Sequence, residues 1–215
     1  VSEEIARYIG YDVIPAVSRR PMLPSSVTAR WAVDQEAKNI LSGLGFSEVY
    51  NYDFISSREL DACLLDAAEA VEIKNPLSSD FQYLRQTLLP GLLKTLRYNL
   101  NRGRDAVMIF ESGTVYPKRS LGRTEEANCA GLVFGDFPEG GFWKDGQEKS
   151  DFYQLKGVMS RLFAGKGGFR FEKPASGPRY FQRGLCLEMK LGGAPAGYVG
   201  KVDAAVAAAF DLKDD

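Results

Sequence analysis

The chain has 215 residues, of which 45% are hydrophobic, and its 27 Lys and Arg residues nearly balance its 28 Asp and Glu residues. A chain of this kind can bury a core of ordinary size, and we expect one main domain with a small appendage. The formal net charge of -1 argues against a dedicated nucleic-acid binder, which usually carries a strong basic excess. The sequence has no histidine, so the usual general base, zinc ligand and triad partner of hydrolases and metalloenzymes are missing.

The sequence favours a cytoplasmic protein that does not enter a membrane. It contains no apolar run of about 18 residues that could span a bilayer. Its cysteines, Cys63, Cys129 and Cys186, lie far apart among apolar neighbours, which is typical of reduced core thiols. The first residue is Val1 and a helix start follows at once, so we expect the chain to be cut from a longer polypeptide.

Residues 1–24 are expected to form the end of a small preceding domain and a linker. A short helix is predicted over Ser2–Ile9, and Gly10 would end it. A stretch rich in Pro and Ser then leads to Pro24, where we place the domain boundary. Residues 25–215 would form the main domain.

Hydrophobic spacing in the main domain predicts helices that alternate irregularly with strands. Three predicted helices cover residues 28–44, 57–65 and 204–210. Another runs from Leu89 to a stop at Gly103, and another runs from an Asp151 cap through Leu162. The predicted strands cover residues 46–54, 71–73, 106–111, 114–116, 130–134, 169–171, 185–189 and 198–202. A hairpin is expected across Ser112-Gly113. This pattern indicates an α+β fold with a mostly antiparallel sheet flanked by helices.

Four stretches of the sequence carry a family resemblance when they are taken together. They are, in chain order, residues Glu3 to Pro15, residues Asn75 to Gly103, residues Ile109 to Tyr116 and residues Asp151 to Gly157. In this order and spacing they resemble the β chain of bacterial-type phenylalanyl-tRNA synthetases over nearly the whole chain. A weaker match at Ala196 to Lys201 departs from the family, because Asp203-Ala204 stands where a His-Pro pair usually follows.

The resemblance implies a class II aminoacyl-tRNA synthetase-like core that does not itself catalyse the reaction. In the family the β chain assembles with a catalytic α chain, usually as α2β2. The complete enzyme uses ATP to attach phenylalanine to its tRNA. The resemblance also implies a magnesium site that includes Glu3 and Glu4. In the family, upstream aspartates that are absent from this chain complete that site.

The helix over residues 28–44 has two faces with different predicted roles. An apolar stripe at helical spacing could pack on the domain core, and it consists of Val33, Ala37, Ile40, Leu41 and Leu44. Arg30 and Trp31 lie off this stripe, and both residue types are enriched at protein interfaces. The resemblance implies that this helix contacts the α chain, and packing within its own domain is the alternative.

The sequence lacks the residues that activation of an amino acid with ATP requires. A working class II core surrounds the triphosphate with arginines and metal, and closes a glycine-rich motif with an arginine. The glycine-rich stretch after Asp151, Gly192-Gly193, has no such arginine. Arg85 and Glu111 remain as candidate relics of a catalytic surface, or alternatively as a structural ion pair or polar cap. We therefore expect no catalytic residue and no ATP site on this chain.

An active class II ligase module and a stand-alone RNA-binding domain are the alternative functions. The missing arginine motif argues against the first, and the near-zero net charge argues against the second. Local positive charge does lie along and beyond the helix that begins at Leu89, at Lys94, Arg97, Arg102 and Arg104. This charge suits a phosphate backbone, a solvated face or an acidic partner.

Overall fold

The computed structural model describes residues 1–15, 28–118, 125–138, 147–149 and 152–212. It divides the chain into two compact units, Val1–Ala32 and Val33–Asp215. Pro24, where the domain boundary is expected, lies outside the described residues. Within these residues, no helix is both long enough and apolar enough to cross a membrane.

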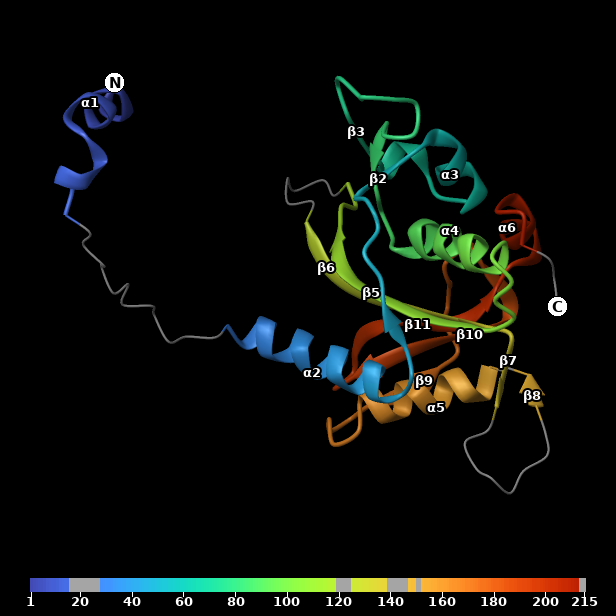
Figure 1. Cartoon of the computed structure of the whole chain (residues 1–215). Helices are drawn as coiled ribbons and strands as arrows, with labels where there is room; N and C mark the ends of the chain where they lie inside the picture. The colour runs from blue at the N-terminus through green and yellow to red at the C-terminus, as the bar shows by residue number, and fades with distance from the viewer. Residues whose placement is uncertain (16–27, 119–124, 139–146, 150–151, 213–215) are drawn as a thin grey trace. The chain divides into compact units, whose positions relative to one another are not determined.

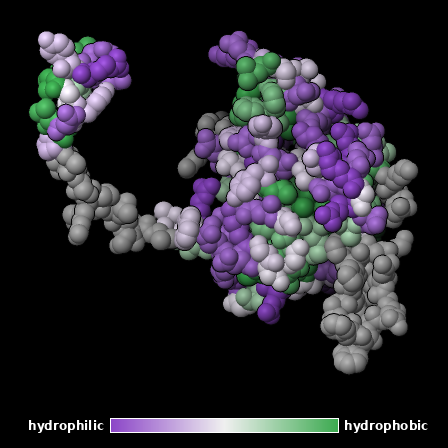
Figure 2. Space-filling model, in the orientation of Figure 1, coloured by the Kyte–Doolittle hydropathy of each residue, from purple (hydrophilic) through white to green (hydrophobic). Residues whose placement is uncertain are grey.

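The unit Val1–Ala32 contains the short helix that the sequence predicts. Helix α1 (Ser2–Ile9) is followed by a 3-10 turn, η1 (Tyr11–Val13). Gly10 lies between them with a φ of 95°, a backbone conformation that glycine adopts without strain. Every residue of α1 is described and at least partly exposed, and the surface of this unit carries hydrophobic as well as hydrophilic residues (Figure 2).

In the remainder of the chain, helices and strands alternate irregularly, as predicted. The helices are α2 (Ala29–Gly43), α3 (Ser57–Ala62), the 3-10 helix η2 (Ala67–Glu69), α4 (Leu89–Leu100), α5 (Phe152–Leu162) and α6 (Ala204–Ala209). The strands are β1 (Ser47–Glu48), β2 (Phe54–Ile55), β3 (Val71–Glu72), β4 (Tyr83–Leu84), β5 (Val107–Val115), β6 (Glu126–Phe134), β7 (Asp136–Pro138), β8 (Gln147–Lys149), β9 (Arg170–Glu172), β10 (Phe181–Leu191) and β11 (Ala194–Val202).

Most strand pairs of the described residues are antiparallel. The sheets have the orders β1-β5-β6, β11-β10-β9, β2-β4-β3 and β7-β8, and the parallel pair is β1 with β5. The two longest ladders, β5 with β6 and β10 with β11, join long neighbouring strands. The α+β class with mostly antiparallel pairing is therefore confirmed.

Strand β5 carries hydrophobic core on both of its faces. Val107, Ile109 and Val115 join a cluster formed with helices α4 and α6. Met108 and Phe110 instead join a cluster formed with α2 and α5. Figure 1 shows the same layers, with α4 on one side of the β5–β6 ribbon and α5 on the other. This alternation is the two-residue period of a strand that is buried on both faces.

Helix α4 is attached to the sheet by the leucine stripe that the sequence predicts. Leu92, Leu93 and Leu96 are almost completely buried. Pro90 occupies the first turn, where the missing N–H of proline breaks no helical hydrogen bond. Burial of each such leucine contributes roughly 1.5–3 kcal/mol. The packing of α4 therefore gives its N-terminal end and the nearby strand residues a defined position.

The hairpin expected across Ser112-Gly113 is wrong. Strand β5 runs without a break through both residues, and its partner is β6, with Ser112 opposite Cys129 and Gly113 opposite Asn128. Gly113 does not form a turn but allows the Arg85 side chain to approach the strand closely. A Cβ atom added to Gly113 would lie 2.5 Å from Nη2 of Arg85.

The single strand expected over residues 46–54 is also wrong. The segment contributes β1 to one sheet and β2 to another. Between them, the Val49 N–H donates to the Phe110 carbonyl at 2.8 Å, which continues the β1–β5 pairing. The Asn51 N–H instead donates to a carboxylate oxygen of Glu111 at 3.3 Å. A side-chain acceptor thus replaces the strand partner, and the ladder ends.

Two predictions of burial also need correction. Val33, expected in the apolar stripe of α2, is exposed, whereas Leu41 of the same stripe is buried. Cys129, expected as a core thiol, is exposed on β6, and Cys186 is only partly buried. Cys63 is a core residue as expected, and its burial raises the pKa of its thiol to about 12.

Candidate functional site

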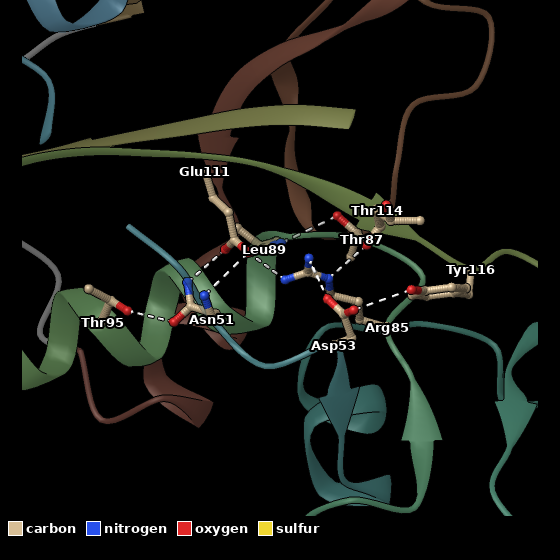
Figure 3. A network of polar contacts seen from close by, with 9 residues as sticks. All are labelled: Asn51, Asp53, Arg85, Thr87, Leu89, Thr95, Glu111, Thr114 and Tyr116. Atoms are coloured by element: carbon tan, nitrogen blue, oxygen red, sulfur yellow. Dashed lines mark hydrogen bonds and ion pairs between the residues drawn. The ribbon is translucent and has the colours of Figure 1, made fainter. Parts of the chain in front are cut away.

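Arg85 and Glu111 form a buried ion pair between the end of β4 and the middle of β5. Only 4% of Arg85 and 2% of Glu111 is exposed, and Nη1 of Arg85 lies 2.5 Å from Oε1 of Glu111. The arginine has two further partners, which Figure 3 shows. Its Nε donates to the Thr114 carbonyl at 2.9 Å, and its Nη2 lies 2.8 Å from Oδ1 of Asp53. All three nitrogens of the guanidinium group therefore have a partner.

The second carboxylate oxygen of Glu111 is held by Asn51. Nδ2 of Asn51 donates to Oε2 of Glu111 at 2.7 Å. The side-chain oxygen of Asn51 in turn accepts from Oγ1 of Thr95, on helix α4, at 2.9 Å. A buried charge is costly unless it is paired and hydrogen-bonded. The network meets this requirement for Glu111 from two sides.

Asp53 and Tyr116 form the outer end of the network. The hydroxyl of Tyr116 donates to Oδ2 of Asp53 at 3.2 Å. Desolvation by the surrounding protein, and then the nearby Asp53 charge, raise the pKa of Tyr116. The main chain joins the same elements, because the Arg85 N–H donates to the Asp53 carbonyl and the Tyr116 N–H donates to the Arg85 carbonyl, each at 2.8 Å.

Two glycines leave the space that this network occupies. A Cβ atom on Gly113 would meet the Arg85 guanidinium group, as described above. A Cβ atom on Gly91, in the first turn of α4, would lie 2.8 Å from Cβ of Asn51. Both distances are too short for real atoms. The two glycines and the polar side chains therefore fit together as one arrangement.

The contacts of the network occupy the charged groups of both Arg85 and Glu111. Arg85 and Glu111 form an ion pair, which is the structural alternative to a catalytic relic. A triphosphate that approached Arg85 would have to displace the carboxylates of both Glu111 and Asp53 from it. Phosphate binding by this arginine would therefore cost two charge-assisted contacts.

A second polar cluster attaches α2 to the sheet. Oγ of Ser112 on β5 donates to Oδ1 of Asp34, and Nζ of Lys38 lies 2.8 Å from Oε1 of Glu48 on β1. The hydrogen bond to Glu48 raises the pKa of Lys38, with a further contribution from Asp34. Within the described residues these contacts, together with buried Leu41, define the inward side of α2.

The fold is similar to that of a known tRNA synthetase. The crystal structure of pyrrolysyl-tRNA synthetase from Desulfitobacterium hafniense matches 86% of this chain and 63% of its own chain, with a TM-score of 0.65 and 16% sequence identity. A second structure of that enzyme, called PylSc, matches with a TM-score of 0.64. The class II synthetase-like fold expected from the sequence is thereby confirmed.

A family model described as the phenylalanyl tRNA synthetase beta chain CLM domain matches residues 14–215. The chain belongs to this family. It is 34% identical to the phenylalanine–tRNA ligase beta subunit of Syntrophus aciditrophicus over 99% of this chain. It is also 34% identical to that of Moorella thermoacetica over 98% of this chain. In both comparisons it spans only 27% of the length of the relative.

Glu3 and Glu4, the candidate magnesium ligands, belong to helix α1 of this beta-chain segment. Both are exposed on the first turn of α1, and Arg7 lies 3.2 Å from Glu3 and 3.6 Å from Glu4. Hard cations need several oxygen ligands. Among the described residues, no group of three or more His, Cys, Asp or Glu is placed to hold a metal ion. A magnesium site at these glutamates remains a prediction.

The two interface candidates lie at the start of helix α2. Trp31 is 55% exposed and Arg30 is exposed as well, so neither side chain is used in a core. The N–H of Trp31 donates to the Thr28 hydroxyl at 3.3 Å, which helps to begin the helix. The role of these residues at an interface remains a prediction.

Sequence reasoning missed several members of the buried network, namely Asn51, Asp53, Thr95 and Tyr116. A signal was present in the order Tyr50-Asn51-Tyr52-Asp53, where polar and aromatic residues alternate. Such alternation predicts an ordinary strand. The sequence did not show that the polar side chains turn inward to a buried charge pair.

Proposed function

We propose that this chain is the non-catalytic core of a phenylalanine–tRNA ligase β subunit. It supports the ATP-dependent attachment of phenylalanine to tRNA by assembling with the catalytic α subunit as an α2β2 complex in the cytoplasm. The α subunit uses the ATP, and the complete enzyme binds the tRNA. Glu3 and Glu4 contribute to a magnesium site only together with ligands from outside this chain.

The observation that carries the non-catalytic assignment is the complete engagement of Arg85. Catalysis of amino-acid activation depends on cationic groups that are free to meet the phosphates. In this synthetase-like fold, the buried arginine beside α4 is held by Glu111, Asp53 and the Thr114 carbonyl instead. Membership of the β-chain family supports the same conclusion.

The glycine-rich stretch that lacks the arginine of a working class II core supports this proposal too. Gly192 and Gly193 form the tight turn between β10 and β11, and their φ angles are 59° and 87°. Two consecutive residues with positive φ are typical of a two-residue hairpin turn. The glycines therefore have a sufficient structural reason, which weakens the active-ligase alternative.

The alternative of a stand-alone RNA-binding domain is weakened by how the local cations are used. Arg97 lies 2.9 Å from Asp211, and Lys94 lies 2.6 Å from Glu59. Pairing with acidic side chains reduces the positive potential that a phosphate backbone requires. The overall charge of -1 adds to this argument.

The direct test is to mix the chain with candidate α subunit and measure the mass of the complex. We expect a stable complex, and an α2β2 mass when the complete β polypeptide is used. An aminoacylation assay should show activity only when α subunit is present. Activity of the chain alone would support the active-ligase alternative, and tRNA binding without any α association would support the RNA-binding alternative.

A further inference from the structure

Two parts of helix α2 are attached to the rest of the domain by different kinds of contact. At the C-terminal end, Leu41 is 2% exposed and forms an apolar cluster with Phe46 and Phe110. The Phe46 N–H donates to the Leu41 carbonyl at 3.1 Å, which holds the end of the helix next to the start of β1. Hydrophobic burial therefore anchors this end.

The part of α2 that precedes Leu41 has no comparable apolar anchor. Its apolar residues Ala37 and Ile40 are only partly buried. Trp31 and Val33, nearer the start of the helix, are 55% and 60% exposed. An isolated helical segment shorter than about 12 residues is only marginally stable in water. This part of the helix therefore depends on the polar contacts that hold it to the sheet.

Those polar contacts converge on Lys38. Its Nζ atom lies 2.8 Å from Oε1 of Glu48 on β1 and 3.4 Å from Oδ2 of Asp34, one turn earlier in α2. Asp34 also accepts a hydrogen bond from the Ser112 hydroxyl on β5. Only 19% of the Lys38 side chain is exposed, so the ion pairs are partly shielded from water. One ammonium group thus joins two carboxylates that would repel each other without it.

A second ion pair on α2 has a different character. Nζ of Lys166 lies 3.0 Å from Oε2 of Glu36, and the two side chains are 43% and 50% exposed. Exposed ion pairs contribute little to stability, because water screens the charges and ordering two long side chains costs entropy. We therefore do not expect this pair to hold the helix, and it provides a matched comparison for Lys38.

We propose that α2 is held closed on the sheet by an electrostatic latch, which consists of Asp34, Lys38, Glu48 and Ser112. When the latch opens, residues 33–40 leave the sheet and unwind, while Leu41 stays anchored. Segments with few buried apolar contacts open locally at a lower free energy than global unfolding requires. Charge brought next to Lys38 shifts this equilibrium, so the latch makes the docking of α2 sensitive to electrostatics. The latch does not depend on the proposed function, because every contact that forms it lies within this chain.

The first measurement determines whether α2 opens separately from the domain. Hydrogen–deuterium exchange of the complete β polypeptide, read by mass spectrometry, follows residues 33–40 and helix α4 at increasing low concentrations of urea. A local opening exposes little surface, so exchange of residues 33–40 should depend weakly on urea, whereas exchange of α4 should accelerate steeply. Equal rates and equal urea dependence in the two helices would show that α2 opens only when the domain unfolds, and the latch would be wrong.

The second measurement determines whether Lys38 is the group that holds α2. Lys38→Met removes the ammonium group and leaves the carboxylates of Asp34 and Glu48 facing each other. We expect the same segment of α2 to exchange about tenfold faster or more in this variant. Lys166→Met breaks the exposed pair and is the matched control, which should leave the exchange rate nearly unchanged. Equal acceleration by the two variants, or none in Lys38→Met, would refute the latch.

The sign of the salt dependence separates an electrostatic latch from a simple loss of packing. In the wild type, added salt screens the attraction between Lys38 and its carboxylates and should speed the exchange of α2, relative to the unfolded chain under the same conditions. In Lys38→Met, salt screens the repulsion between Asp34 and Glu48 and should slow the exchange. Adding Glu48→Gln to Lys38→Met removes that repulsion and should restore part of the protection. A salt response of the same sign in the wild type and in Lys38→Met would overturn the electrostatic latch.

Discussion

Glu111 is an acidic residue at a position of β5 where the strand alternation calls for an apolar one. Its side chain points toward α4, as do those of Ile109 and Val115, and it is tolerated there because Arg85 pairs with it. Replacing Arg85 by Met would leave Glu111 buried without its main partner. We expect a loss of about 3–5 kcal/mol in the free energy of unfolding, measured by denaturant titration.

A double variant and an exposed ion pair provide the controls for this prediction. Arg85→Met combined with Glu111→Met should lose less stability than Arg85→Met alone, because no isolated charge remains buried. Arg170→Met breaks the exposed contact with Glu172 and should cost less than about 1 kcal/mol. Equal losses of stability for the buried and exposed arginines would show that the buried network stabilises the fold no more than an exposed ion pair does.

Substitution by alanine should change the stability of the protein in opposite directions at two glycines. At Gly113 the added methyl group would collide with Arg85, and we expect a loss of roughly 1–3 kcal/mol. At Gly157, in the middle of helix α5, nothing lies within 4 Å of an added Cβ atom. Alanine should therefore stabilise that helix by roughly 0.5–1 kcal/mol. Thermal unfolding of the two variants checks both signs, and a stable Gly113→Ala variant would contradict the network geometry.

At the scale of elements, helix α2 is attached to the sheet along its inner side and leaves Trp31 exposed. Trp31→Ala should leave the fold intact, because the side chain is not part of a core. We expect it to cost about 2 kcal/mol or more in association with the α subunit. A titration against α subunit measures this, with circular dichroism as the folding control. Undiminished association would remove Trp31 from the interface, and unfolding would assign it to the core.

Helix α1 leads to a prediction about magnesium. Its two adjacent glutamates are exposed and share the positive charge of Arg7. Two carboxylates alone leave a hard cation mostly coordinated by water, so we expect affinity of roughly millimolar or weaker for the isolated chain. Calorimetric titration with magnesium measures it. Tight binding that disappears in Glu3→Ala would show that α1 holds the ion without further ligands.

At the scale of the whole molecule, we expect the isolated chain to show no measurable binding of ATP with magnesium. The buried arginine that could meet a phosphate is already bound to two carboxylates. Calorimetry with the wild-type chain tests this expectation. A micromolar dissociation constant that is lost on mutation of Arg85 would return this residue to a working role.

Much of the molecule could be predicted from local sequence. The leucine spacing of α4 and the helix in residues 152–162 reflect a period of 3.6, which a single element can show by itself. The positions of several strands, and thus the α+β class, follow from apolar segments between turn residues. The lengths of the strands could not be predicted in this way, since β6 and β10 extend well beyond the predicted residues 130–134 and 185–189. Exposed ends of a long strand carry small or polar residues that have no apolar pattern.

The sequence by itself determined the main helices, the mixed fold class and the family resemblance, because each of these depends on residues close together along the chain. Only the tertiary structure decided the role of Arg85, Glu111 and Asn51, which come from separate segments and meet through non-local packing. It also decided that Gly113 makes room for an arginine and forms no turn. The physical reason is that a buried charge requires partners in space, and sequence spacing does not specify which distant residues supply them.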